Sequence, residues 1–167
     1  MSVDLTPFRG LSLFTGVNDE QLARLGARLR RRLVPSGTQI LSEGERSTSV
    51  YLLGRGTVVT TKRLGLVVRS ELDADKQKLL VRFSAPQFFG EIGLLSDLER
   101  TATVTADTEC EVLELTRGDF EHVVQDDLAL GYQMVRNIAI VIGERLRNTD
   151  RDVLKLTAAL SLSLGNR

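Results

Sequence analysis

A long stripe of mainly apolar residues toward the C-terminal end of the chain constrains the fold more than any other feature. Its ten positions are separated alternately by 4 and 3 residues: Leu128, Tyr132, Val135, Ala139, Ile142, Leu146, Thr149, Val153, Leu156 and Leu160. This repeat places them on one face of an α-helix, at the a and d positions of a coiled coil. Such a helix is about 50 Å long at a rise of about 1.5 Å per residue, which takes it past the edge of one small domain. We therefore expect its far half to need a partner.

Two arrangements would cover this stripe. The helix can pair in parallel with a second copy and make a homodimer, or it can break near Gly143 or Asp150 and fold back onto its own domain. The register continues through both positions, which favours the homodimer. Thr149 is the polar residue of the stripe, and polar residues at such positions lower coiled-coil stability in exchange for specificity.

Short β-strands are expected in the middle of the chain. Runs of β-branched and apolar residues separated by glycine or charged turns are typical of strands, and six are present: Val50 to Leu53, Thr57 to Thr61, Leu66 to Val68, Leu79 to Phe83, Thr101 to Thr105 and Glu111 to Leu115. Strands this short and numerous predict an antiparallel β-roll, a jelly-roll-like barrel. Asn18 with Gln21, and Thr116 with Asp119, are typical helix starts. The expected fold class is α+β, with an N-terminal helix before the barrel and a long C-terminal helix after it.

The clearest chemical signal lies in two neighbouring segments, FGEIGLL at residues 89–95 and RTATV at residues 100–104. A helix beginning near Glu91 leaves its first backbone N–H groups without intrahelical partners, and with the helix dipole these attract a phosphate. Gly90 and Gly93 let a phosphate approach the backbone, and the planar guanidinium of Arg100 suits phosphate oxygens. Glu91 lies between apolar neighbours and can accept a hydrogen bond from a ribose hydroxyl. The two segments therefore predict binding of a phosphorylated ribose.

These segments resemble the phosphate-binding cassette of the cyclic nucleotide-binding domain family, which includes the bacterial catabolite activator protein, cAMP-dependent kinase regulatory subunits and cyclic nucleotide-gated channels. The family pattern F-G-E-[IL]-[AG]-L-L, a short loop, then R-[ATS]-A-[TS]-V is matched completely. The resemblance implies that Glu91 holds the ribose 2′-OH and that Arg100 contacts an exocyclic phosphate oxygen. It also implies that Gly90, Ile92 and Gly93 lie along the phosphate-binding backbone.

The resemblance extends beyond the cassette, over roughly residues 10–150. Residues 13–22 look like the family's entry helix, and residues 37–45 look like its first barrel hairpin. Ser47 departs from the acidic or glycine-rich turn that the family often has, and we expect it to have no role toward a ligand.

Further residues near a bound base are implied by the same resemblance. Aligning residues 144–149 with the central helix of the activator family puts Thr149 where that family contacts adenine. Asn148 or Asp150 could close over the base beside it. The alternative for Thr149 is a threonine that sets the helix register and touches no ligand.

Three more positions complete the expected site. Val81 and Phe83 align with strand residues that pack on the base without identifying it. Thr101 directly follows Arg100, where a hydroxyl in this family can meet the 2-amino group of guanine, although related domains with threonine or serine there bind cAMP. The match at Thr149 favours cAMP as the ligand, with cGMP as the other possibility.

The resemblance implies a bacterial regulator in signal transduction that binds a cyclic nucleotide without reacting with it. Residues 1–125 would form the nucleotide-binding β-roll with its flanking helices. Residues 126–164 would form the helix that serves as lid and dimerisation segment and passes the signal to an unknown downstream protein. The first alternative is a regulatory domain cut from a larger regulator, channel or enzyme, although Met1 and the soft C-terminal sequence favour a stand-alone sensor. The second is a degenerate interaction domain, against which the intact Glu91 and Arg100 argue.

Five arginines cluster early in the chain: Arg24, Arg28, Arg30, Arg31 and Arg32. Leu22, Leu25 and Leu29 have helical spacing, so we expect the cluster on a helix that ends at the turn of residues 35–37. Without interleaved aromatic residues, a solvated helix face is favoured over a nucleic-acid site. The 22 basic and 22 acidic residues cancel, which gives no general attraction to nucleic acid or anionic membranes. These observations argue against direct DNA binding.

The remaining composition predicts a cytoplasmic chain without a membrane span. The lone cysteine, Cys110, excludes an internal disulfide and suits a reducing compartment. No charged-then-apolar leader opens the chain, and no apolar run approaches the roughly 18 residues of a spanning helix. The only histidine, His122, has no metal-ligand spacing to Cys110, so no metal is expected.

Overall fold

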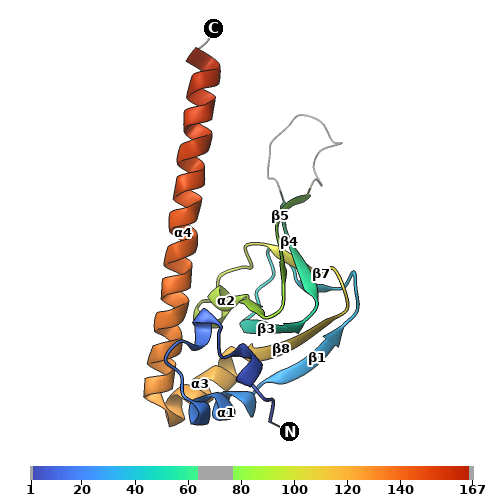
Figure 1. Cartoon of the computed structure of the whole chain (residues 1–167), viewed down its shortest axis with the longest axis vertical. Helices are drawn as coiled ribbons and strands as arrows, with labels where there is room; N and C mark the ends of the chain where they lie inside the picture. Colours follow the sequence, from blue (N-terminus) through green and yellow to red (C-terminus); the bar gives the residue numbers. More distant parts are fainter. Residues whose placement is uncertain (1, 64–76, 166–167) are drawn as a thin grey trace.

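Two antiparallel β-sheets form a barrel, and helices close one end of it and run along one side (Figure 1). In this computed structural model, residues 2–63 and 77–165 are described. The strands are β1 (Arg30–Val34), β2 (Gln39–Leu41), β3 (Ser49–Arg55), β4 (Thr57–Arg63), β5 (Gln77–Ser84), β6 (Gln87–Phe89), β7 (Thr103–Ala106) and β8 (Cys110–Thr116). The helices are η1 (Thr6–Phe8), η2 (Ser12–Phe14), α1 (Asp19–Gly26), α2 (Glu91–Leu95), α3 (Arg117–Asp126) and α4 (Leu128–Gly165).

The sheet topology confirms the predicted α+β fold with an antiparallel β-roll. One four-stranded sheet has the order β1-β8-β3-β6 and the other has the order β2-β7-β4-β5. The sequence predicts β3, β4, β5, β7 and β8 to within a few residues. The strand expected at Leu66 to Val68 lies outside the described residues.

Successive residues of β3 enter two separate hydrophobic cores. Val50 and Leu52 pack with the helices, whereas Tyr51 and Leu53 belong to the core inside the barrel. Because successive side chains of a strand point to opposite faces, β3 has one buried face toward the helices and one toward the other sheet. Each fully buried side chain of this size contributes about 1.5–3 kcal/mol. The barrel is thereby fixed to the helical layer through its central strand.

The first helix is shorter than its leucine spacing predicts, and the expectation of one helix reaching residue 35 is wrong. The helix α1 ends at Gly26, whose carbonyl accepts a hydrogen bond from the Val3 N–H at 2.9 Å. A side chain at position 26 would clash with the Val3 carbonyl oxygen. The chain then extends as β1, which pairs antiparallel with β8 from Arg30 opposite Glu114 to Val34 opposite Cys110.

The arginine cluster is therefore divided between a helix and a strand, and carboxylates face most of it. Arg31 pairs with Glu111 of β8 at 2.5 Å, and Arg32 lies 3.5 Å from Glu114. Arg30 approaches Asp119 at 3.8 Å. These contacts neutralise the charges locally, so the cluster is no open basic patch.

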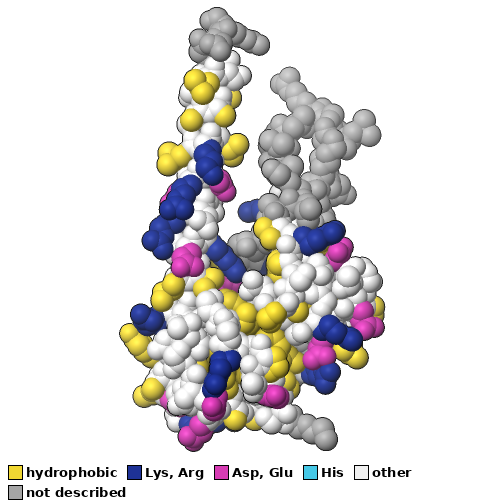
Figure 2. Space-filling view, viewed as in Figure 1, with side chains coloured by type: hydrophobic (Ala, Val, Ile, Leu, Met, Phe, Trp, Pro, Cys, Tyr) yellow, Lys and Arg dark blue, Asp and Glu magenta, His cyan; other side chains and the backbone are white. Residues whose placement is uncertain are grey.

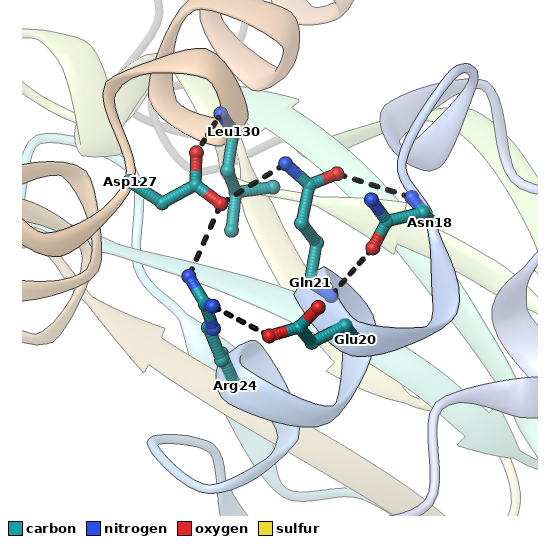
Figure 3. A network of polar contacts seen from close by, with 6 residues as sticks. All are labelled: Asn18, Glu20, Gln21, Arg24, Asp127 and Leu130. Carbon is teal, nitrogen blue, oxygen red and sulfur yellow. Dashed lines mark hydrogen bonds and ion pairs between the residues drawn. The ribbon is translucent and has the colours of Figure 1, made fainter.

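A polar network ties α1 to the start of α4 (Figure 3). The predicted capping box is present, because the Asn18 side chain accepts from the Gln21 N–H at 2.9 Å and the Gln21 side chain accepts from the Asn18 N–H at 3.1 Å. Asp127 accepts from the Gln21 amide at 3.1 Å, from Arg24 at 3.3 Å and from the Leu130 N–H at 2.9 Å. The backbone hydrogen bond from Leu130 is the main reason that the pKa of Asp127 is lowered.

The C-terminal helix α4 is continuous over its 38 residues, without a break at Gly143 or Asp150 (Figure 1). Its first half is anchored, since Leu130, Met134 and Ile138 are fully buried. The polar Asn137 is also buried there, and its amide donates to the carbonyls of Leu13 at 2.9 Å and Thr15 at 2.8 Å. The fold-back arrangement is therefore excluded for this helix.

Beyond Gly143 the helix leaves the barrel, and the described side chains of residues 144–163 are exposed. Yellow apolar side chains remain visible along this upper half (Figure 2). Four residues of the predicted stripe are among the exposed large apolar side chains of this half: Leu146, Val153, Leu156 and Leu160. No helix formed by the described residues combines the length and apolarity that crossing a bilayer requires.

Candidate functional site

A cavity of about 600 Å³ lies between the barrel, α2 and the middle of α4. The space-filling view shows the molecule hollowed between the long helix and the barrel (Figure 2). All nine residues predicted to contact a ligand line this cavity: Val81, Phe83, Gly90, Glu91, Ile92, Gly93, Arg100, Thr101 and Thr149. The structure therefore brings together residues that are up to 68 positions apart in the sequence, from Val81 to Thr149.

The carboxylate of Glu91 lies buried at the first position of α2, where only 1% of the residue is exposed. Arg145 of α4 donates from Nη1 to Oε1 of this carboxylate. The other oxygen, Oε2, is buried and has no hydrogen-bond partner among the described residues. An unpaired buried acceptor is unfavourable, so this position is suited to a ligand group that donates a hydrogen bond.

The guanidinium of Arg100 is also buried, with 6% of the residue exposed. Nη1 donates to the Gly90 carbonyl at 2.6 Å, while Nη2 donates to Ser47 Oγ at 2.9 Å and to the Ser49 carbonyl at 2.6 Å. Burial is the main reason that the pKa of Arg100 is lowered from its usual value. Nε has no partner. Arg100 thus holds the loop before β3 to the start of α2 and keeps one donor unused.

Ser47 has a role that sequence reasoning missed. The departure from the family pattern at this position was expected to be without consequence for the site, yet its hydroxyl accepts one of the hydrogen bonds that orient Arg100. No sequence signal links the two residues, which are 53 positions apart.

Glycine is required at positions 90 and 93 of the cassette for two different structural reasons. Gly90 has a φ of 79°, in the left-handed region that favours glycine. A side chain at Gly93 would clash with Arg100 Nη1 and the Ser47 carbonyl. Gly93 therefore makes room for the arginine. Its N–H, expected to be free for a phosphate, donates to the Gly90 carbonyl at 3.1 Å.

Three polar residues of α4 line the cavity: Arg145, Asn148 and Thr149. Their spacing of three and four residues puts them on one side of the helix. Thr149 donates its hydroxyl hydrogen to the Arg145 carbonyl at 3.0 Å. Arg145 was not predicted from the sequence, although its spacing from Thr149 was a usable signal.

The opposite wall of the cavity includes apolar side chains of β5. Phe83 packs on Phe89 with ring centroids 5.9 Å apart. Val81 is 54% exposed, so it has free apolar surface beside the cavity. A flat ring could lie between this wall and the polar side of α4. The described residues contain no group of three or more His, Cys, Asp or Glu side chains that could hold a metal ion.

The sequence matches the family described as "Cyclic nucleotide-binding domain" over residues 31–127, which include the barrel and the cassette. The chain belongs to this family.

Its similarity to individual proteins extends further along the chain. It is 28% identical over 145 residues to the Cyclic AMP receptor protein of Thermus thermophilus, a match that covers 87% of this chain and 62% of that protein. It is 29% identical over 138 residues to the cAMP-activated global transcriptional regulator Vfr of Pseudomonas aeruginosa, covering 80% and 59%. The chain therefore spans about 60% of the length of these relatives. A cAMP-dependent protein kinase regulatory subunit of Eremothecium gossypii is 29% identical over 116 residues, covering 70% of this chain and 23% of that protein.

Solved structures agree with this assignment. The crystal structure of the Thermus thermophilus Catabolite Activator Protein superposes with a TM-score of 0.74 at 27% identity, covering 87% of this chain and 63% of that one. The N-terminal domain of a transcriptional regulator from Streptomyces coelicolor gives a TM-score of 0.69 at 26% identity, covering 87% and 93%. These structures therefore agree with the assignment of the chain to the cyclic nucleotide-binding domain family.

Proposed function

We propose that this chain binds a cyclic nucleotide in the cavity between barrel and α4, with cAMP preferred over cGMP. The observation that carries the proposal is a pair of unsatisfied atoms. Among the described residues, the buried side-chain nitrogen and oxygen atoms without a partner are Glu91 Oε2 and Arg100 Nε. Both residues line the same cavity. One is an acceptor and the other a donor, which a ribose hydroxyl and a phosphate oxygen would satisfy together.

The charge of the cavity supports the same ligand. Among the lining residues, Arg100 and Arg145 carry positive charges, and the buried carboxylate of Glu91 carries a negative charge. Glu99 also lines the cavity, but its carboxylate lies within 4.0 Å of Arg46. The remaining positive charge complements the single negative charge of a cyclic phosphate, and donors to phosphate are strongest when they are charged.

Two observations support a preference for adenine as the base. The named relatives that match over most of this chain are a cyclic AMP receptor protein and a cAMP-activated regulator. Thr149 of α4 lies at the cavity, as an adenine contact requires. We therefore propose adenine as the base that this site prefers.

Transmission through α4 follows from the contacts of Arg145. This residue joins the buried carboxylate of Glu91 to the part of α4 that has left the barrel. A ribose hydroxyl at Glu91 would compete with Arg145 for that carboxylate. This competition would shift the most stable position of α4. The downstream protein would then respond to the position of α4.

Pairing of two copies through α4 would complete the sensor. The apolar stripe has an exposed far half, with Leu156 71% exposed, and a contiguous apolar stripe of this kind marks an interaction surface. Sedimentation of the L156E variant should give a monomer where the unaltered chain gives a dimer. L162E, which lies off the stripe, is the matched control. A monomeric unaltered chain would refute pairing.

Calorimetric titration tests the ligand directly. The protein is unfolded, washed and refolded to remove any nucleotide carried from expression, and is then titrated with cAMP and cGMP side by side. We expect both to bind, with cAMP tighter, and R100A to lose most affinity because the phosphate loses its charged donor. R147A, an exposed arginine on the same helix, is the control. Absence of binding to either nucleotide would refute the proposal, and tenfold tighter binding of cGMP would reverse the base preference.

A further inference from the structure

The short helix α2 is held at both ends by arginine side chains from other parts of the chain. It has only five residues, and isolated helices of fewer than about 12 residues are marginal in water. Glu91 is its first residue, and Arg100 Nη1 donates to the carbonyl of the preceding Gly90 at 2.6 Å. The placement of α2 therefore sets where this carboxylate and this guanidinium lie relative to each other in the cavity.

Arg117 holds the other end of α2. It is the first residue of α3, and its Nε donates to the Leu94 carbonyl at 3.1 Å while its Nη2 donates to the Gly93 carbonyl at 2.9 Å. The last carbonyls of a helix have no partner within the helix, and a basic side chain at this end also matches the helix dipole. The third nitrogen, Nη1, pairs with the exposed carboxylate of Asp97. Arg117 thus supplies hydrogen bonds that the short helix cannot make for itself.

The two arginines are anchored on three consecutive residues where the chain enters β3. Arg100 Nη2 donates to Ser47 Oγ at 2.9 Å and to the Ser49 carbonyl at 2.6 Å. Between these two, the Thr48 carbonyl accepts from the backbone N–H of Arg117 at 2.9 Å. Both ends of α2 are therefore fixed with respect to the same strand. The Arg117 side chain reaches α2 from α3, outside the set of residues that line the cavity.

We propose that Arg117 is a positioning residue for the nucleotide: it holds α2 where Glu91 and Arg100 can contact one ligand, without touching that ligand itself. The inference rests on the proposed function, since it requires that a cyclic nucleotide occupies the cavity. Without the two carbonyl hydrogen bonds, α2 would keep this placement in only a fraction of the molecules. The apparent Kd rises by the inverse of that fraction, so a fraction of about one tenth weakens binding about tenfold.

Calorimetric titration with cAMP and hydrogen exchange of the nucleotide-free protein test this role together. R117M keeps an apolar stem and loses the guanidinium, whereas R117K keeps the charge as a compact ammonium that cannot reproduce the fork. We expect R117M to weaken cAMP binding about tenfold, and R117K to fall between R117M and the unaltered chain. In R117M the amides of residues 91–96 should exchange faster by a larger factor than those of Leu130 and Met134 in α4, because the loss is local.

D97N is the matched control for the ion pair of Arg117. It removes the charge of an exposed partner and leaves both carbonyl hydrogen bonds of Arg117 in place. Exposed ion pairs contribute little, so the cAMP affinity of D97N should stay within about twofold of the unaltered chain. Its exchange at residues 91–96 should also stay unchanged.

Three results would overturn the inference while leaving the proposed function intact. One is cAMP binding by R117M equal to that of the unaltered chain, and the same result for R117K decides the matter should R117M fail to fold. Another is an equal rise in exchange throughout R117M, which would indicate a general structural role. The third is a loss in D97N as large as that in R117M. If the unaltered chain does not bind cAMP, the proposed function fails and this inference fails with it.

Discussion

Replacing Arg145 by methionine would leave the buried carboxylate of Glu91 without a hydrogen-bond partner. The Glu91 side chain is 2% exposed, Oε2 is already unpaired, and Arg145 is the described residue that donates to Oε1. Removing one partner of a buried ion pair costs about 3–5 kcal/mol. Because the Arg145 side chain is 54% exposed, water reaches one end of this pair. We therefore expect a smaller destabilisation of about 2 kcal/mol, which lowers Tm by about 4–8 °C in a chain of this size.

Urea unfolding of nucleotide-free protein measures this loss. R147M makes the same chemical change two positions further along the helix at a side chain without an ion pair among the described residues, and it should stay within about 0.5 kcal/mol of the unaltered chain. The double variant E91Q/R145M buries a neutral amide in place of an unpaired charge. It should recover about 1–2 kcal/mol relative to R145M alone.

Two outcomes would refute this reasoning. If R145M unfolds at the same urea concentration as R147M, the ion pair does not compensate the burial of Glu91. If E91Q/R145M is no more stable than R145M, the loss arises from packing of the arginine stem instead of from the unpaired charge.

Three further predictions concern other parts of the molecule. T149V should weaken cAMP binding without changing the sedimentation of the protein, and unchanged affinity would exclude Thr149 from the site. G143A should stabilise the chain against urea by about 0.5–1 kcal/mol, because an added Cβ meets no atom within 4 Å and glycine is unfavourable inside a helix. A loss of stability there would contradict the open space beside Gly143. D127N should be less stable than the unaltered chain near pH 7, since the lowered pKa of Asp127 means that its charged form stabilises the fold. This difference should shrink as the pH falls below about 4, where the unfolded carboxyl takes up a proton before the folded one does, and should vanish below the lowered pKa of the folded carboxyl. A difference independent of pH would refute it.

Local signals in the sequence predicted the elements whose causes are local. The capping box at Asn18 and the cap of Thr116 on α3 are both present, because each depends on residues three positions away. The continuity of α4 followed from its unbroken apolar register. The strand β1 was mistaken for helix, since Leu25 and Leu29 keep helical spacing and the pairing with β8 that makes it a strand involves residues about 80 positions away.

The candidate site divides in the same way, into residues that local sequence signals predicted and residues that depend on contacts between distant positions. The cassette was recognisable because its residues are close in sequence, and all nine expected residues line one cavity. Arg145 and Ser47 were missed because their contacts with Glu91 and Arg100 span 54 and 53 positions. The structure also gives a reason for glycine at position 93 that differs from the expected approach of a phosphate. Gly93 accommodates a guanidinium from another part of the chain, which a search for phosphate contacts could not reveal.

The buried amide of Asn137 gives α4 the geometry of a lever. Its hydrogen bonds to the carbonyls of Leu13 and Thr15 fix the helix at that point, and a shift there would break both bonds and leave the buried Asn137 amide unpaired. Arg145 lies about 12 Å beyond this fulcrum and Leu160 about 35 Å beyond it, at about 1.5 Å per residue. A rigid rod that pivots at Asn137 would therefore turn a displacement of about 1 Å at Arg145 into one of about 3 Å at Leu160. In the transmission proposed above, the length of the exposed helix would set the ratio of these two displacements.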